Sequence, residues 1–172
     1  VELSVRGHCY DGIVGLAGCD KSLPGLMMAM VRLNIPSVFI YGGSILPGNY
    51  KGKDLTIIDV FEAVGKHASG EIDEKELKNI EKVACPTAGS CGGQFTANTM
   101  ACISEALGLA LTNSAMTPAT YEERDNYGFE SGKAVMDLIE KNIGPRDIVT
   151  LESLKNAAVV VAATGGSTNA AL

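Results

Sequence analysis

Three side chains of different chemistry stand next to one another in the first part of the chain. They are the thiol of Cys19, the carboxylate of Asp20 and the amine of Lys21. All three follow a short apolar run at residues 13–17. A thiolate binds iron and other soft ions, whereas a carboxylate oxygen binds Mg²⁺. The turn as a whole therefore indicates a metal site, while each residue taken alone indicates only a buried thiol beside a surface ion pair.

A second thiol, Cys91, stands in a similar setting. It lies in a loop of small residues at 85–93, shortly before an Ala-rich helical stretch. Two thiols at turn–helix junctions suggest one centre shared with Cys19. The chain contains neither the Cys-x-x-Cys spacing of zinc sites nor the cysteine run of ferredoxins, so spacing alone does not specify the metal. The remaining cysteines are expected to be packed or merely close to the site: Cys9, Cys85 and Cys102.

The same turn also resembles a phosphate-binding loop. Residues 15–22 (GLAGCDKS) nearly match the pattern G-x-x-x-x-G-K-[ST], which must lie between a strand and a helix. Asp20 replaces the glycine before the lysine, and its carboxylate would face the phosphates that the loop should hold. A nucleotide-binding module is therefore the alternative to a metal site.

The elements expected around this turn place it at the end of a buried strand. Residues 13–17 are expected to form a strand, and residues 23–31 repeat apolar side chains at helical spacing. Residues 37–41 (SVFIY) are typical of a second strand, so the first part of the chain predicts a βαβ unit. Open α/β sheets bind ligands at the carboxyl ends of their strands, which is where the turn lies.

The remainder of the chain is predicted to be mainly helical. We expect a loop at residues 44–53 and further helices from the apolar spacing or capping signals of later segments. These helices are expected at 57–64, from Asp73 and Glu76 to just before Cys85, at 95–111, from Thr117 and Pro118 onward, and after a cap at Thr150. The valines at 159–161 could equally form a strand, and the acidic run at 122–125 is interpreted as a solvated helix start. The predicted fold class is α/β, a helix-rich parallel-sheet domain of the α/β/α sandwich type.

Composition supports a single globular α/β domain over residues 1–172. The chain is 46% hydrophobic and 20% charged, with a formal net charge of −6. This charge and the lack of Lys and Arg clusters argue against nucleic acid and anionic membranes as partners. An odd number of scattered cysteines argues against a disulfide framework and favours a reducing setting, cytoplasmic or, in a eukaryote, organellar. The longest apolar run, at 157–163, is shorter than the ~20 residues that a membrane span needs.

Four segments together resemble the dihydroxy-acid dehydratase family, which also contains phosphogluconate and sugar-acid dehydratases. They are residues 19–25 (CDKSLPG), 41–48 (YGGSILPG), 91–100 (CGGQFTANTM) and 164–169 (TGGSTN). The resemblance covers essentially the whole chain, and segment 41–48 is more similar to the branched-chain enzymes than to the phosphogluconate enzymes. It implies an internal fragment of an N-terminal α/β domain, incomplete at both ends and without the family's β-rich C-terminal domain. It also implies a homodimer or dimer of dimers in the full-length protein.

The resemblance implies a role for each of the four candidate residues. Cys19 and Cys91 resemble ligands of an iron–sulfur cluster, [2Fe–2S] rather than [4Fe–4S], whose third cysteine lies upstream of Val1. Asp20 resembles a Mg²⁺ ligand. Lys21 resembles a lysine that is carbamylated in the family, which turns a cation into an anionic oxygen ligand for the same Mg²⁺.

The implied reaction removes water from a small 2,3-dihydroxy carboxylate and gives a 2-keto acid, as in branched-chain amino acid biosynthesis. An open iron position acts as a Lewis acid on the C3 hydroxyl, while Mg²⁺ holds the carboxylate and the C2 oxygen. The family's base and its remaining Mg²⁺ ligands have no counterpart in these residues. No catalytic residue is therefore assigned, and the chain alone is expected to be inactive. A sugar-acid or phosphogluconate dehydratase is the alternative within the family.

Overall fold

A parallel pair of strands lies at the centre of the computed structural model, which describes residues 1–172. β1 (Ile13–Ala17) pairs with β2 (Ser37–Tyr41), and α2 (Ser22–Leu33) connects them. The predicted βαβ unit is therefore confirmed. All residues of β2 are buried, as expected for an interior strand with helices on both faces.

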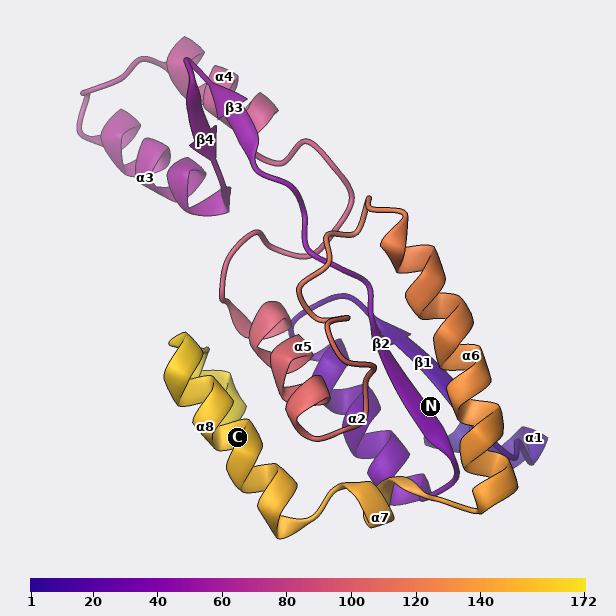
Figure 1. Ribbon diagram of the computed structural model, residues 1–172. Coiled ribbons are helices and arrows are strands. Elements are labelled where there is room, and N and C mark those ends of the chain that lie inside the picture. The colour runs from indigo at the N-terminus through magenta and orange to yellow at the C-terminus, as the bar shows by residue number, and fades with distance from the viewer.

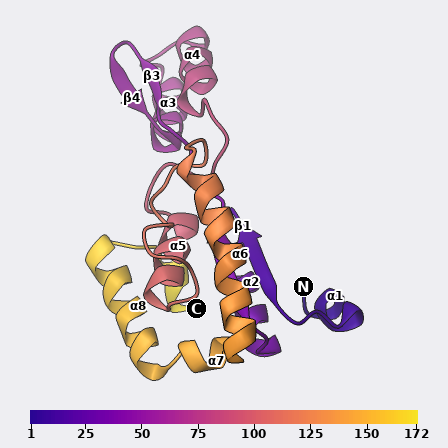
Figure 2. The same ribbon diagram turned by 45° about the vertical axis from the view of Figure 1, so that its right-hand side comes forward.

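Helices cover both sides of this strand pair (Figures 1 and 2). α6 (Glu123–Lys141) runs along one side, and α2 and α5 (Thr96–Ala106) lie along the other. α7 (Pro145–Ile148) leads to α8 (Leu151–Thr164), which packs on α5. The short α1 (Glu2–His8) begins the chain, and the 3-10 helix η1 (Thr168–Ala171) lies near its end. The chain is thus helix-rich with a small parallel sheet, and the predicted α/β class is confirmed.

The main core lies between β2, α2 and α5. Phe39 and Tyr41 of β2 are fully buried, and they belong to one apolar cluster with Leu23 and Met30 of α2 and Ala101 of α5. Each large apolar side chain buried in this way contributes about 1.5–3 kcal/mol to folding. The core therefore anchors the carboxyl end of β2, from which the site is built.

A hairpin lobe, defined here as residues 48–84, projects from the strand pair (Figure 1). It consists of the antiparallel β3 (Gly48–Tyr50) and β4 (Lys53–Leu55), followed by α3 (Ile57–Ala68) and α4 (Glu74–Ala84). The prediction of a loop over residues 44–53 is wrong here. Strands of this length are too short to show alternation in the sequence, and their turn is made by two residues with positive φ, Lys51 at 53° and Gly52 at 80°.

Capping side chains start helices in both parts of the molecule. Asp73 Oδ1 accepts a hydrogen bond of 2.7 Å from the Glu76 N–H at the start of α4. The carboxylate of Glu76 does not return this bond, as a capping box would require, because it pairs with Lys51 Nζ at 2.6 Å and so ties the hairpin to α4. The predicted cap at Thr150 is confirmed, since its Oγ1 accepts from the Ser153 N–H at 3.2 Å. The valines at 159–161 lie within α8.

Two other helix boundaries differ from the sequence prediction. α5 ends at Ala106 rather than at residue 111, because Gly108 takes a φ of 82° and the chain then turns back so that Ala110 forms a parallel bridge with β2. The helix expected to open at Thr117 begins only at Glu123, and turns fill the residues between. The apolar spacing and the proline correctly predicted a helix in each region. They did not predict the contact with β2 that shortens α5.

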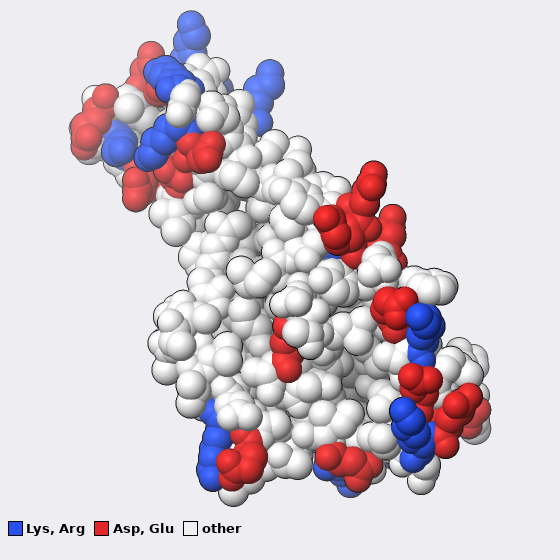
Figure 3. Space-filling model, in the orientation of Figure 1, with Lys and Arg blue, Asp and Glu red and all other residues white.

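Charged side chains are distributed unevenly over the surface. Both signs of charge gather on the hairpin lobe and near α6, whereas few charged side chains lie over α5 on the face shown in Figure 3. None of the helices combines the length and the apolar composition needed to cross a membrane.

Gly48 begins β3 at the point where the strand lies against α4. A Cβ there would stand 1.6 Å from the carbonyl oxygen of Val83, which belongs to the backbone and cannot move aside easily. We expect Gly48→Ala to lower the free energy of unfolding by about 1–3 kcal/mol. Gly65→Ala in α3, where no atom lies within 4 Å of the added Cβ, should raise it by about 0.5–1 kcal/mol. Urea unfolding followed by circular dichroism measures both, and equal effects would contradict this account of Gly48.

Candidate metal centre

The candidate centre lies at the edge where β1 and β2 end. Ala17 is paired with Tyr41 at the last position of both strands, so the turns that follow them begin side by side. The turn after β1 carries Cys19. The turn after β2 contains Gly43, which has a φ of 94° and whose Cβ would lie 2.6 Å from the backbone of Ala119. Only glycine fits at position 43. The prediction that the Cys19 turn lies at the carboxyl end of a strand is confirmed.

Ser22, the first residue of α2, closes the turn after β1. Its Oγ donates to the Cys19 carbonyl oxygen at 2.6 Å and accepts from the Cys19 N–H at 3.2 Å. These bonds fix the backbone and leave the thiol exposed. Lys21 Nζ lies 3.8 Å from Asp20 Oδ1, and the two side chains are 68% and 51% exposed. An exposed pair at this distance adds little stability, so the fold itself does not explain why these charges are here.

Cys19, Asp20 and Cys91 line one cavity of about 280 Å³. The remainder of its wall comes from α3 and the start of α5, and it is mainly apolar: Ile57, Phe61, Phe95, Thr96 and Ala97. The structure therefore brings both predicted thiols and the predicted carboxylate together. Lys21 does not line the cavity and is linked to it through Asp20. No group of three or more His, Cys, Asp or Glu side chains in the chain is arranged to hold a metal ion by itself.

A larger cavity of about 580 Å³ lies between α2, α5 and α8. Its lining is almost entirely apolar, and it contains none of the four candidate residues. It also lacks the carboxylates and thiols that could carry a reaction. The smaller cavity is therefore the better candidate for chemistry, despite its size.

Asn98 in the first turn of α5 connects the Cys91 loop to β2. Its Nδ2 donates to the carbonyl oxygen of Cys91 at 3.0 Å and also to the carbonyl oxygen of Gly93. Its Oδ1 accepts a hydrogen bond from the hydroxyl of Tyr41. Asn98 is not among the residues predicted from the sequence to belong to the site. Its place in the segment 91–100 was the only signal in the sequence.

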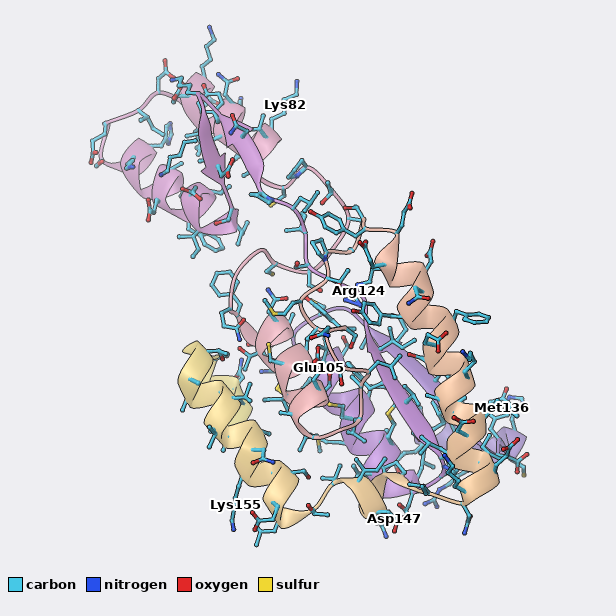
Figure 4. The ribbon with its side chains drawn as sticks, viewed as in Figure 1. Lys82, Glu105, Arg124, Met136, Asp147 and Lys155 are labelled. Carbon is cyan, nitrogen blue, oxygen red and sulfur yellow. The ribbon has the colours of Figure 1, made fainter.

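Arg124, from the start of α6, covers the same end of β2 (Figure 4). Its guanidinium carbon lies 5.5 Å from the centre of the Tyr41 ring, and it donates to the carbonyl oxygens of Ser114 at 2.7 Å and Thr117 at 3.0 Å. Burial raises the pKa of Tyr41, and the positive charge of Arg124 opposes that rise. Burial likewise lowers the pKa of Arg124. The interpretation of residues 122–125 as a solvated helix start is therefore wrong for Arg124.

The segment 164–169 reaches the start of α5 from the other side. Thr96 Oγ1 lies 2.9 Å from Ser167 Oγ and accepts from Asn169 Nδ2 at 2.9 Å. Thr99 Oγ1 accepts from the Ser167 N–H, also at 2.9 Å. Together with the Asn98 contacts and the shared cavity, these bonds bring all four segments of the family resemblance to the amino-terminal end of α5.

The other cysteines lie outside the cavity. Cys9 and Cys85 are exposed, Cys102 is half-buried, and none of the five cysteines forms a disulfide. Cys102 Sγ accepts a hydrogen bond of 3.8 Å from Gln94 Nε2, so Cys102 is close to the Cys91 loop. The expectation that these three residues are packed or merely close to the site holds for Cys102, whereas Cys9 and Cys85 are neither buried nor part of the cavity.

Comparison with known proteins now adds to the geometry. A family model described as dihydroxy-acid/6-phosphogluconate dehydratase, N-terminal, matches residues 1–172. The chain belongs to this family. Curated proteins named dihydroxy-acid dehydratase are 75% identical over 99% of the chain in Pelagibacter ubique and 73% identical over 100% in Dinoroseobacter shibae. One from the more distant Sulfurisphaera tokodaii is 57% identical over 100% of the chain.

The match confirms the predicted family and N-terminal position. The family description names dehydratases and not a nucleotide-binding module such as the one considered for residues 15–22. The chain spans 30% of the length of the Pelagibacter and Dinoroseobacter relatives and 31% of the Sulfurisphaera protein. Their names therefore describe much longer proteins than this chain.

Thr96 is the point at which segment 164–169 is held on α5. We expect Thr96→Val, which keeps the shape but removes the hydroxyl, to cost about 1–3 kcal/mol, because the Asn169 side chain loses its acceptor and the Ser167 hydroxyl loses one of its two partners. Amide hydrogen exchange at residues 166–170 should speed up accordingly. Thr117→Val is the matched control, since the Thr117 hydroxyl makes only a long exposed contact of 3.4 Å. Unchanged exchange at 166–170 in Thr96→Val would show that these contacts do not hold the segment.

Proposed function

We propose that this chain is the metal-binding segment of a hydro-lyase that dehydrates a 2,3-dihydroxy carboxylate to a 2-keto acid. Membership in the dehydratase family supports this class of reaction. The shared cavity is the observation that carries the assignment to particular residues, because two thiols far apart in sequence and one carboxylate open into it. Cys19 and Cys91 are exposed and not packed in the core, and they differ from the exposed Cys9 and Cys85 in lining the same cavity.

Cys19 and Cys91 would hold an iron–sulfur cluster at this cavity, together with a thiol from outside these residues. Thiolate sulfur is the ligand that such clusters require, and both thiols are free of disulfides. Phe61 and Phe95 give the cavity an apolar wall, which would lower the polarity around a bound cluster. When bound, a [2Fe–2S] cluster with an open iron position supplies Lewis acidity towards the C3 hydroxyl of the substrate.

Asp20 and Lys21 would hold Mg²⁺ beside the cluster. With Lys21 Nζ only 3.8 Å from Asp20 Oδ1, an ammonium group would repel a divalent cation bound there. Carbamylation removes this conflict: the neutral amine adds to CO₂, an N–C bond forms, and the proton lost from nitrogen leaves a carbamate anion. Its oxygens and the Asp20 carboxylate are the hard ligands that Mg²⁺ prefers.

The other residues around the cavity position these ligands. Ser22 fixes the backbone of the Cys19 turn, and Phe61 and Phe95 contribute apolar surface to the wall of the cavity. No group that would remove the C2 proton is assigned in this chain, so we expect the chain alone to lack dehydratase activity. The relatives are named dihydroxy-acid dehydratase, which supports a dihydroxy acid as the substrate. A dimeric full-length protein stays a prediction.

Replacing either proposed cluster ligand should remove iron. In a full-length dehydratase carrying this segment and prepared without oxygen, Cys19→Ser and Cys91→Ser should each lose most of the bound iron and sulfide, because a hydroxyl is a poor substitute for a thiolate. Cys9→Ser is the matched control, since Cys9 is exposed but lies outside the cavity. Full iron content in both ligand variants would contradict the assignment. Tight ATP binding by metal-free protein, abolished by Lys21→Ala, would favour the nucleotide-binding module instead.

Carbamylation of Lys21 has its own spectroscopic test. After incubation of the full-length protein with ¹³C-bicarbonate and Mg²⁺, a carbamate carbon signal should be present in the NMR spectrum and absent from Lys21→Arg, which keeps the positive charge but cannot form the carbamate. Mg²⁺ affinity should fall by at least about tenfold in the same variant. Lys51→Arg serves as the control, because Lys51 lies in the hairpin and pairs with Glu76. A carbamate signal that persists in Lys21→Arg would show that the signal does not come from Lys21 and would contradict carbamylation of this residue.

A further inference from the structure

We propose that Asn98 is a positioning residue that holds the Cys91 loop in the geometry needed for cluster binding, and that Tyr41 in turn fixes Asn98. The proposal rests on the proposed function of Cys91 as a cluster ligand. Asn98 and Tyr41 are not proposed as ligands of the cluster. They would determine the position of Cys91, which is.

The side-chain amide of Asn98 is completely satisfied, and this fixes its orientation. Its two Nδ2 hydrogens are donated to the carbonyl oxygens of Cys91 and Gly93, which can only accept. Its Oδ1 accepts from the Tyr41 hydroxyl. Flipping the amide would set an oxygen against two carbonyl oxygens. The network therefore defines a single arrangement of the side chain.

The hydrogen bonds donated by Asn98 stabilise the Cys91 loop and do not cap α5. α5 begins after Phe95 without any side-chain cap, and Asn98 in its first turn does not supply one, because it donates to carbonyl groups outside the helix. Within the loop, the only other hydrogen bond to the Cys91 carbonyl oxygen is that of the Gly93 N–H at 3.0 Å. Residues 92 and 93 are glycines with no side chains of their own. Asn98 is thus a side chain from outside the loop that restrains its backbone.

Tyr41 gives the network a rigid support. It is fully buried in the core at the last position of β2, and its partner in the register is Ala17, two residues before Cys19. The same residue therefore lies next to the Cys19 turn through the sheet and next to the Cys91 loop through Asn98. Ligand groups of metal sites are commonly oriented by such supporting hydrogen bonds, and losing one costs about 10–100-fold in metal affinity or activity.

The experiment uses a full-length dehydratase carrying this segment, prepared without oxygen. Asn98→Asp keeps the size and the acceptor for Tyr41 but removes both donations to the loop. We expect it to release iron to a chelator about tenfold faster than the unmodified protein, and to change the electron paramagnetic resonance spectrum of the reduced cluster. Tyr41→Phe, which removes only the hydroxyl, should shift both readouts in the same direction by less.

Ser104→Ala is the matched control. It removes a buried hydrogen bond of 2.6 Å from the same helix, to the carbonyl oxygen of Ala101, far along α5 from the loop. It should lower the melting temperature without changing iron release or the spectrum. If Asn98→Asp does not fold, Tyr41→Phe carries the test alone.

The outcomes separate the two proposals. A cluster-containing protein in which Asn98→Asp and Tyr41→Phe leave iron release and the spectrum unchanged overturns the positioning role and leaves the proposed function standing. A protein that binds no cluster, or that keeps its full iron content in Cys91→Ser, overturns the proposed function and this inference with it. An equal effect of Ser104→Ala would show that general destabilisation, and not loop position, controls the cluster.

Discussion

Parallel pairing makes β1 and β2 end together, with Ala17 opposite Tyr41. The turn that carries Cys19 therefore starts next to the turn after β2, although a whole helix separates the strands in the sequence. A slip of one residue in this register would move every side chain of β2 to the other face of the sheet. Tyr41 would then face α6 instead of α5 and lose its contact with Asn98. The Cys19 turn and the Cys91 loop would then no longer be connected through Tyr41.

The start of α5 supplies the second half of the centre. Asn98 reaches the Cys91 loop and Tyr41, while Thr96 and Thr99 bind the segment that contains Ser167. The polar residues of the family segments thus divide into two groups. One group holds the segments against one another, and the other, the thiols and the carboxylate, lines the cavity. Thr96 belongs to both, because it lines the cavity and also contacts Ser167 and Asn169.

Local patterns predicted the central strands but not the hairpin lobe. β2 could be predicted because its residues form one β-branched and aromatic run ending before two glycines. β3 and β4 are too short for such a pattern, and their contacts are with distant residues, namely Gly48 against the Val83 carbonyl and Lys51 with Glu76. Only the folded chain reveals these.

The candidate residues could be predicted from their chemistry, whereas their supports could not. Cys19, Asp20 and Cys91 are conspicuous because few structural needs place such groups at turns. Asn98 and Arg124 look like ordinary helix residues. The hydroxyl that orients Asn98 belongs to a residue 57 positions away, and Arg124 covers that same residue from a third element. Roles of this kind arise from tertiary contacts and leave no local signal.

Anomalous diffraction at the iron absorption edge tests the central claim most directly. Crystals of a full-length dehydratase carrying this segment, grown without oxygen, should show iron density within bonding distance of Sγ of both Cys19 and Cys91. Iron that contacts neither thiol, or separate metal peaks at the two cysteines, would contradict the account. The same map would show whether the amide of Asn98 still joins the Cys91 loop to Tyr41 when the centre is complete.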